Sequence, residues 1–306
     1  MHFALESCSL LFPIDMTRRI LILTAITFAI AAALISFNNI FPHKSESERK
    51  TAHLSIDDVE IMTGDIIRHQ DEYNSIFDNR FLSFLKDCHD EYGAKFTLYT
   101  YAHTPAYSLR EFPDKFKDEF YANRDWLRFG FHWIEPAFRE GVDVKTFKEA
   151  FHEVNTSIER FAGKGSISRT LRLHYFYLPD SLRDVTGGGN LLSADTEGRQ
   201  SYNLSEAECE RLWQVKHLKK DSTEYFTTDI RIENHPLIAY ELKKHQDRDT
   251  LVVFTHEWQL GNQSYREVIG ALIHDREIRS KKLNEFNLRY TCRWLRDNGY
   301  EFSFLE

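Results

Sequence analysis

The stretch Leu54-Ser55-Ile56-Asp57-Asp58-Val59 decides the predicted fold, because a short apolar run ends there in two adjacent carboxylates. Ala52, Leu54 and Ile56 alternate with polar residues, which is the pattern of a β-strand. In an α/β protein the carboxyl ends of the strands face the crevice in which ligands bind. Two neighbouring aspartates repel each other unless a cation or a shared proton compensates. The pair is therefore a candidate site, and the alternative is that it caps the following helix.

Strand-like runs alternate with helix-like runs along the rest of the chain. We expect strands at 52–56, 95–101, 127–131, 170–177, 190–194, 225–232, 250–254 and 300–305. We expect helices at 77–91, 143–161, 205–219, 236–245 and 277–298. This alternation predicts a parallel sheet, and seven or eight such units predict its closure. The expected fold class is α/β, a (β/α)7–8 barrel over residues 51–306.

Composition and charge argue against some classes of function. Hydrophobic residues make up 42% of the chain and charged residues 28%, as in ordinary globular proteins. The net charge of -8 and the lack of a concentrated basic run argue against a nucleic-acid partner. The four cysteines contain no C-x-x-C pair, so we expect buried thiols rather than a redox or metal motif.

The amino-terminal region predicts export. An apolar, charge-free run spans residues 20–37 and follows two arginines, which favours a cytoplasmic location for residues 1–19. This run is either a signal anchor that stays in the membrane or a signal peptide that is cleaved. Residues 38–50 are polar and are expected to form a linker to the folded domain. In both cases we expect an extracytoplasmic protein, periplasmic or at the cell surface, secreted or anchored through residues 20–37.

Acids and histidines lie at or just beyond the ends of the expected strands. They are Asp57, Asp58, His103, His132, Glu135, His174, Asp195, Asp229, His256 and Glu257. In a barrel these strand ends converge on one face. A ring of Asp, Glu and His around one mouth has the composition of a metal site for hydrolysis. Any single member is more often structural than functional, so the prediction rests on the whole set.

These motifs resemble those of the polysaccharide deacetylases of carbohydrate esterase family 4, which have a distorted (β/α) barrel. Residues 55–58 resemble the first family motif, a Thr/Ser-Phe-Asp-Asp strand end. Residues 129–132 resemble the strand that leads into a His-x-x-x-His metal pair, and residues 251–256 resemble a last motif that ends in histidine. Arg172 and Tyr175 lie where the arginine-bearing third motif is expected.

The resemblance implies a metal-dependent hydrolase that removes acetyl groups from a cell-surface or extracellular polysaccharide. It implies that Asp57 is the general base and that His256 is the general acid for the leaving amine. It also implies that Asp58 and His132 bind a divalent metal, with zinc (Zn²⁺) expected. General chemistry supports this division, because a bound metal lowers the pKa of water to about 7 and histidine can donate a proton near neutral pH.

One position departs from the family pattern. The second metal histidine is expected four residues after His132, where Pro136 stands and cannot ligate. Glu135 is the nearest candidate, since a carboxylate oxygen can bind zinc. The first alternative is a weak or lost metal site. The second is a third ligand from elsewhere in the chain: His103, His174 or Glu257.

Five residues are candidates for substrate binding: Arg172, Tyr175, Asp195, Asp229 and Trp258. The polar loop from Asp195 could hold a sugar, and a solvated turn is the alternative. A buried Asp229 requires a partner such as Arg172 or Arg199. Trp258, two residues after His256, could stack on a sugar or simply fill the barrel rim.

Two other functions remain open from the sequence. The first is a carbohydrate-binding or polysaccharide-assembly protein that keeps the barrel without the metal, a reading that Pro136 favours. The second is a barrel glycoside hydrolase in which two of the carboxylates act as acid and base. Metal content separates the metal-dependent hydrolase from both of these alternatives.

Overall fold

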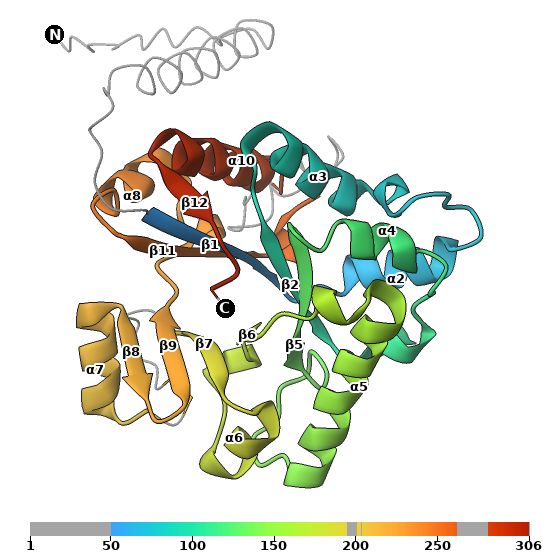
Figure 1. Ribbon diagram of the computed structural model, residues 1–306, viewed down its shortest axis with the longest axis horizontal. Coiled ribbons are helices and arrows are strands. Elements are labelled where there is room, and N and C mark those ends of the chain that lie inside the picture. Colours follow the sequence, from blue (N-terminus) through green and yellow to red (C-terminus); the bar gives the residue numbers. More distant parts are fainter. Residues whose placement is uncertain (1–49, 195–200, 203, 262–280, 306) are drawn as a thin grey trace, which may run out of the picture. The chain divides into compact units, whose positions relative to one another are not determined.

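β1 (Lys50–Asp57) lies inside a parallel sheet, as the opening stretch of the domain predicts (Figure 1). It pairs with β11 (Thr250–His256) on one side and with β2 (Phe96–Tyr101) on the other. β5 (Leu127–Trp133) pairs with β2. Two short strands complete this sheet: β10 (Ile230–Arg231) beside β11, and β12 (Tyr300–Phe302) beside β1. The parallel α/β fold is thus confirmed.

The computed structural model describes residues 50–194, 201–202, 204–261 and 281–305. The predicted membrane segment 20–37 and the loop from Asp195 lie outside these residues. Among the described helices, none combines the length and the apolar character that crossing a bilayer requires.

A second sheet has the order β6-β7-β9-β8. Its strands are β6 (Thr170–Leu171), β7 (Gly189–Ser193), β9 (Thr223–Thr227) and β8 (His217–Lys220), of which β8 alone is antiparallel to its neighbour. A single bridge from Phe129 to Ile167 joins β5 to the segment before β6. At the other edge, Asp229 N donates to Val252 O on β11 at 2.8 Å. At both edges a single backbone contact, and not a ladder of paired strands, joins the two sheets, so a closed barrel is not confirmed.

The two sheets share an interior. Tyr99 from β2, Leu192 from β7 and Val252 from β11 form one small buried cluster. On β1 the apolar residues Ala52, Leu54 and Ile56 belong to the large core. Because side chains alternate along a strand, the polar residues His53, Ser55 and Asp57 project from the opposite face of β1. The face of β1 that carries Asp57 is therefore polar and buried.

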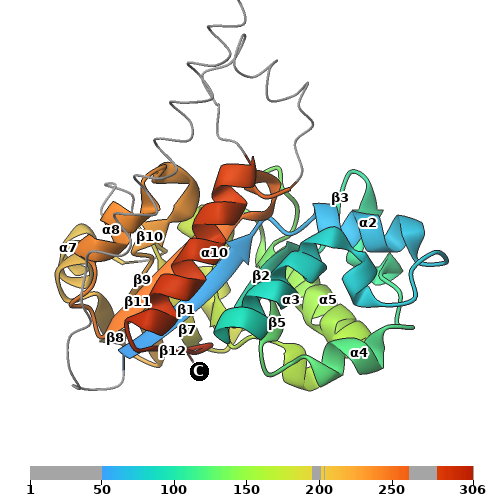
Figure 2. The same ribbon diagram turned by 90° about the horizontal axis from the view of Figure 1, so that it is seen from above.

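Helices surround the main sheet, and Figure 2 shows α3 and α10, which pack on each other, lying over it. The described helices are α2 (Ile61–His69), α3 (Arg80–Tyr92), α4 (Lys117–Ala122), α5 (Val144–Ala162), α6 (Asp180–Thr186), α7 (Glu206–Val215), α8 (Ile238–Lys244) and α10 (Lys281–Asp297). A capping box formed by Ser205 and Glu208 begins α7. Asp143 caps α5, and Gly93 ends α3 in the left-handed conformation.

Besides helices α2 and α6, for which no range was expected, three of the expected elements differ clearly in the structure. The strand expected at 170–177 is only β6, followed by a 3₁₀ turn at His174–Phe176. The strand expected at 225–232 is split into β9 and β10, which belong to different sheets. The helix expected at 205–219 ends at Val215, because Lys216 adopts a φ of 69° and turns the chain into the β8–β9 hairpin.

Candidate active site and metal centre

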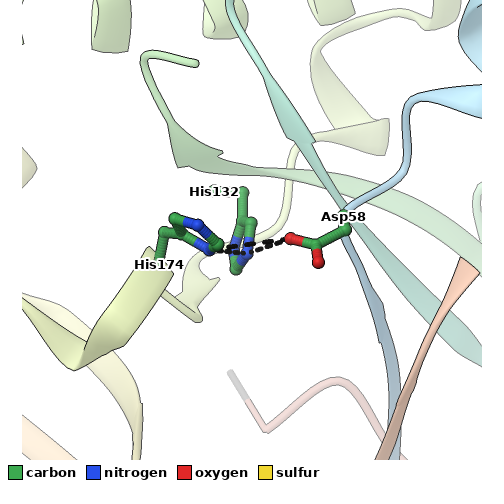
Figure 3. Close-up of side chains that lie close together, drawn as sticks. All are labelled: Asp58, His132 and His174. Atoms are coloured by element: carbon green, nitrogen blue, oxygen red, sulfur yellow. Dashed lines mark hydrogen bonds and ion pairs between the residues drawn. The ribbon is translucent and has the colours of Figure 1, made fainter. Parts of the chain in front are cut away.

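Three ligand atoms come together at Asp58, His132 and His174 (Figure 3). Asp58 Oδ1 lies 3.1 Å from His132 Nε2 and 3.6 Å from His174 Nδ1. The two nitrogens are 3.1 Å apart. Ligand atoms that bind one zinc ion at about 2.1 Å in tetrahedral geometry are separated by roughly 3.4 Å. These residues therefore have the donor types and the spacing of a metal site.

The backbone explains how each side chain reaches this point. Asp58 is the first residue after β1 and has a φ of 55°, a left-handed conformation that aspartate tolerates better than most residues. His132 lies near the end of β5, two residues after Gly130 and on the same face. A Cβ at position 130 would lie 2.6 Å from the ring of Tyr99, so only glycine fits beneath that ring. His174 begins the 3₁₀ turn that replaces the rest of the expected fourth strand.

A backbone carbonyl fixes the tautomer of His132. Its Nδ1 lies 2.6 Å from the carbonyl oxygen of Arg172. A carbonyl oxygen can only accept, so Nδ1–H must be the donor, and Nε2 is the nitrogen that can offer a lone pair to a cation when the ring is neutral. Nε2 is the atom that faces Asp58 and His174. The ring is thus held in the form that binds metals.

Electrostatics favour the metal-binding protonation states at two of the three positions. Burial opposes ionisation of Asp58, but hydrogen bonding to His132 and the nearby histidines outweigh burial and hold its pKa far below the usual range. Burial and the neighbouring His132 lower the pKa of His174 to about 3. A carboxylate and a neutral imidazole are the forms that ligate metals. The donor chemistry therefore fits a divalent cation.

Asp57 is a buried carboxylate beside the candidate metal centre. Its Oδ2 lies 3.3 Å from Arg172 Nε, close enough for an ion pair but without hydrogen-bond geometry. Within the described part of the chain, neither carboxylate oxygen of Asp57 accepts a hydrogen bond. The Arg172 guanidinium is itself held 3.6 Å over the ring of Phe176. Asp57 thus has a compensating charge and free lone pairs, as a group that accepts a proton requires.

His256 is oriented by a buried glutamate. Its Nδ1 lies 2.5 Å from Glu233 Oε1, and Glu233 also accepts hydrogen bonds from Thr255 and Arg231. Burial opposes ionisation of Glu233, but His256 and Arg231 lower its pKa to about 2. Nδ1–H therefore donates to a carboxylate, and Nε2 is left facing the site, 3.9 Å from Asp58 Oδ2.

Glu135 does not lie with the three ligand atoms. Its carboxylate lies 3.9 Å from His103 Nε2 and 3.8 Å from Arg139 Nε. The structure instead brings His174, one of the alternatives left open by the sequence, to Asp58 and His132. Because His174 stands on a different segment from His132, no local spacing motif in the sequence indicates that these two histidines lie together.

The other acids have structural contacts. Asp229 accepts from Arg248 Nη1 at 2.7 Å and from Val252 N at 2.9 Å, so Arg248 is its charged partner among the described residues, and Arg199 lies outside them. Glu257 is buried and accepts three backbone N–H groups at the beginning of α2, at distances between 2.6 and 2.8 Å. Asp195 lies outside the described residues.

Two aromatic candidates lie at the rim of the site. Tyr175 is 59% exposed, and its ring stacks on Phe138 with centroids 4.7 Å apart. Trp258 is 37% exposed, and its indole Nε1 lies 3.1 Å from Asp58 Oδ2. Both rings therefore border the metal centre and remain accessible to a ligand.

The sequence reasoning missed Glu233 and Tyr101. Glu233 directly follows the run expected as a strand at 225–232 and is thus an acid just beyond a strand end, but the candidate from this run is Asp229. Tyr101 ends the expected strand at 95–101, but the candidates at strand ends are limited to acids and histidines. In the structure Tyr101 Oη donates a hydrogen bond to Asp58 Oδ1.

No family model matches the sequence, and no curated protein sequence matches it. Among solved structures, the Xyl-CE4 domain of a multidomain xylanase from the hindgut metagenome of Trinervitermes trinervoides is 10% identical, with a TM-score of 0.45 over 84% of this chain and 87% of that chain. A peptidoglycan deacetylase from Bacillus subtilis is 11% identical, with a TM-score of 0.42 over 84% of this chain and 89% of that chain. A CE4 family pseudoenzyme from Bacillus anthracis is 9% identical, with a TM-score of 0.35 over 85% of this chain and 65% of that chain.

The first and the third of these structures are described as CE4, the family that the sequence motifs resemble, and the third is described as a pseudoenzyme. Because the identities and TM-scores are this low, the function has to be inferred from the side chains of the site.

Proposed function

We propose that this protein is a metal-dependent hydrolase that removes acetyl groups, bound through nitrogen or oxygen, from a polysaccharide. The observation that carries the proposal is the convergence of Asp58, His132 and His174 on one point. Beside them lie a buried carboxylate without a hydrogen-bond donor and a histidine held by a glutamate. A base, an acid and a cation site are the parts that hydrolysis of an acyl group requires.

The three ligand residues suit a divalent cation, and we propose zinc. Two nitrogen donors and one carboxylate oxygen form a ligand set that zinc accepts in catalytic sites. When bound there, the cation would act as a Lewis acid toward the acyl oxygen and toward the attacking water. Three protein ligands leave room for substrate or water, which distinguishes catalytic zinc sites from closed structural ones.

Asp57 is proposed as the general base. Its free oxygens can take the proton of a water that attacks the acetyl carbonyl. Arg172 balances the buried negative charge before that transfer. Removing Asp57 should therefore abolish proton transfer without removing a cation ligand.

His256 is proposed as the general acid. Glu233 accepts from Nδ1–H, so the proton that leaves the ring comes from Nε2, the atom that faces the site. That proton goes to the nitrogen or oxygen of the departing sugar. The same carboxylate stabilises the protonated ring before the transfer, as the buried aspartate does in serine proteases.

A polysaccharide is proposed as the substrate because the site is bordered by exposed aromatic rings. Tyr175 and Trp258 present flat, accessible faces, and a sugar ring can lie on such a face. Arg172 and Asp195 remain candidates for further contacts. Nucleic acid is not proposed as a partner, in keeping with the net charge of -8.

The finer architecture and the location belong to the same proposal. We propose that the two sheets are the walls of a distorted barrel, supported by the bridge between Phe129 and Ile167 and by the interior cluster at Tyr99. Residues 20–37 are proposed as a signal peptide or anchor that places the site outside the cytoplasm.

The test is metal content and acetate release. The purified full chain is analysed for bound metals and then incubated with acetylated chito-oligosaccharides, acetylated xylan and peptidoglycan. We expect zinc and acetate release that stops with a chelator and returns when zinc is added back. A metal-free protein without chelator-sensitive acetate release would overturn the proposal. Cleavage of glycosidic bonds that survives chelation would favour the glycoside hydrolase.

A further inference from the structure

We propose that Tyr101 and Trp258 are positioning residues that hold the two carboxylate oxygens of Asp58 and so preset the cation site. The inference rests on the role of Asp58 as a cation ligand in the proposed function. It assigns a task to two aromatic residues beyond packing and sugar stacking.

The two donors reach different oxygens of the same carboxylate. Tyr101 Oη donates to Oδ1, and Trp258 Nε1 donates to Oδ2 at 3.1 Å. Oδ1 is also the atom that lies 3.1 Å from His132 Nε2. An oxygen has two lone pairs, so Oδ1 can accept from Tyr101 and still bind a cation. Hydrogen bonds of this kind orient ligating carboxylates in metal sites.

The donors come from both sides of β1. Tyr101 is the last residue of β2, and Trp258 lies in the 3₁₀ turn Glu257–Gln259 that follows β11. β2 and β11 are the neighbours of β1 on either side. Asp58 itself stands beyond the end of β1, so the strand ladder does not fix its side chain. The two donors supply the constraint that the ladder lacks.

Tyr101 is suited to donate rather than to ligate. Its side chain is buried, and its contact with Asp58 Oδ1 requires a donor on the tyrosine, because a carboxylate oxygen can only accept. The hydroxyl therefore offers its proton to the carboxylate. Its Oη also lies 3.4 Å from His174 Nδ1, so it borders two of the three ligand atoms.

Preorganisation explains why the hydrogen bonds from Tyr101 and Trp258 to Asp58, which we call the clamp, would matter for the affinity of the site for a cation. A free aspartate side chain must give up its rotational freedom when a cation binds, and that loss weakens binding. Here two hydrogen bonds restrict the carboxylate. Trp258 is partly exposed whereas Tyr101 is buried, so we expect the loss of Tyr101 to cost more.

The experiment measures zinc affinity by calorimetry on the full chain and on Tyr101→Phe and Trp258→Phe. Removing an outer partner of a metal ligand typically weakens metal binding by about 10-fold to 100-fold, and we expect each variant to fall in that range. Two matched controls lose the same kind of bond elsewhere. Tyr73→Phe loses a hydrogen bond to Asp65, and Trp213→Phe loses one to the Ala194 carbonyl. The controls should keep wild-type affinity, and thermal unfolding verifies that all four variants fold.

A second readout follows the metal-free protein. The indole N–H of Trp258 is identified by NMR as the indole resonance missing from Trp258→Phe, and it should move when Asp58→Ala removes its acceptor. A resonance that does not respond to Asp58→Ala would overturn the clamp. Phenolate absorption that appears with zinc and is lost in Tyr101→Phe would also overturn it, because Tyr101 would then be a ligand.

The failure of the clamp and the failure of the hydrolase proposal give different results. If the wild type binds zinc and both variants bind it equally well, the clamp is wrong and the hydrolase proposal stands. If the wild type binds no zinc, the hydrolase proposal is wrong, and the presetting of a cation site is wrong with it.

Discussion

Asp57 and His256 are register partners at the carboxyl ends of the neighbouring parallel strands β1 and β11. The proposed base and the proposed acid are therefore held side by side by the main-chain ladder, although the chain between them forms most of the domain. Neither position depends on a loop for its placement. The cation site, in contrast, is assembled from residues at or beyond the strand ends: Asp58, His132 and His174.

The first prediction concerns the third ligand. His174→Ala removes one of three donor atoms, so we expect zinc affinity to fall by about 100-fold or more, beyond the usual cost of losing an outer partner. Glu135→Gln removes a carboxylate that contacts His103 and Arg139 instead, and should leave the affinity unchanged. Calorimetric titration of both variants with zinc measures the difference. The opposite ranking would restore Glu135 as the ligand.

The second prediction separates the base from the metal centre. Asp57→Asn keeps the size of the side chain and the three cation ligands, but it removes the group that accepts the proton. General-base catalysis typically contributes about 10²-fold to 10⁴-fold, so kcat for acetate release should fall within that range. Zinc content, measured by elemental analysis, should not change. A variant that loses its zinc, or that keeps its kcat, would contradict the role of Asp57.

Some of this site could be predicted from the sequence because the signal was local. An apolar strand that ends in Asp57 and Asp58, and another that ends in His256, are short patterns with a fixed register. Both strands lie next to each other in the structure, in the parallel arrangement that the alternation of elements indicates. The helices expected at 143–161 and 205–219 likewise begin within one residue of α5 and α7.

Other features could not be read from local patterns. His174 joins the metal group only because the chain leaves β6 after two residues and turns, and Tyr175 takes a φ of 55° there. The run at 225–232 carries a strand pattern throughout, yet its two ends pair with different sheets. Helix α2 entered the sequence analysis only through the alternative that Asp57 and Asp58 cap it, whereas the residue that satisfies its first N–H groups is Glu257, which lies far along the chain.

The third prediction concerns stability in acid. The pKa of Glu233 falls from the usual 4.5 to about 2 on folding, so the unfolded state binds more protons between these values. The stability that Glu233 contributes is present above pH 4.5 and is lost as the pH falls toward 2. A shift of this size corresponds to about 3 kcal/mol.

Glu233→Gln cannot titrate, so its free energy of unfolding should depend less on pH in that window. Urea unfolding of the wild type and the variant at several pH values between 2 and 5 measures the two slopes. Equal slopes would show that Glu233 is not held as a buried carboxylate by His256 and Arg231. In acetate release, Glu233→Gln should lower kcat because His256 loses the group that fixes its tautomer.

The last prediction concerns the link between β11 and α2. Glu257 accepts N–H groups from Glu60 and Ile61 through Oε2 and from Met62 through Oε1. Glu257→Gln replaces one of these oxygens with an NH₂ group, which cannot accept, so at least one of these N–H groups, of which that of Met62 is buried, loses its partner. A buried donor without a partner costs about 1–3 kcal/mol.

The matched control is Glu208→Gln, which alters the exposed capping box of α7 and should cost less, since the amide can still serve in a capping box. Urea unfolding gives the free energies, and hydrogen exchange of the amides of residues 60–62 shows whether the loss is local. Because α2 begins directly after the Asp58 loop, faster exchange at these amides should accompany weaker zinc binding. Faster exchange with unchanged zinc affinity would mean that Glu257 stabilises α2 without supporting the metal centre.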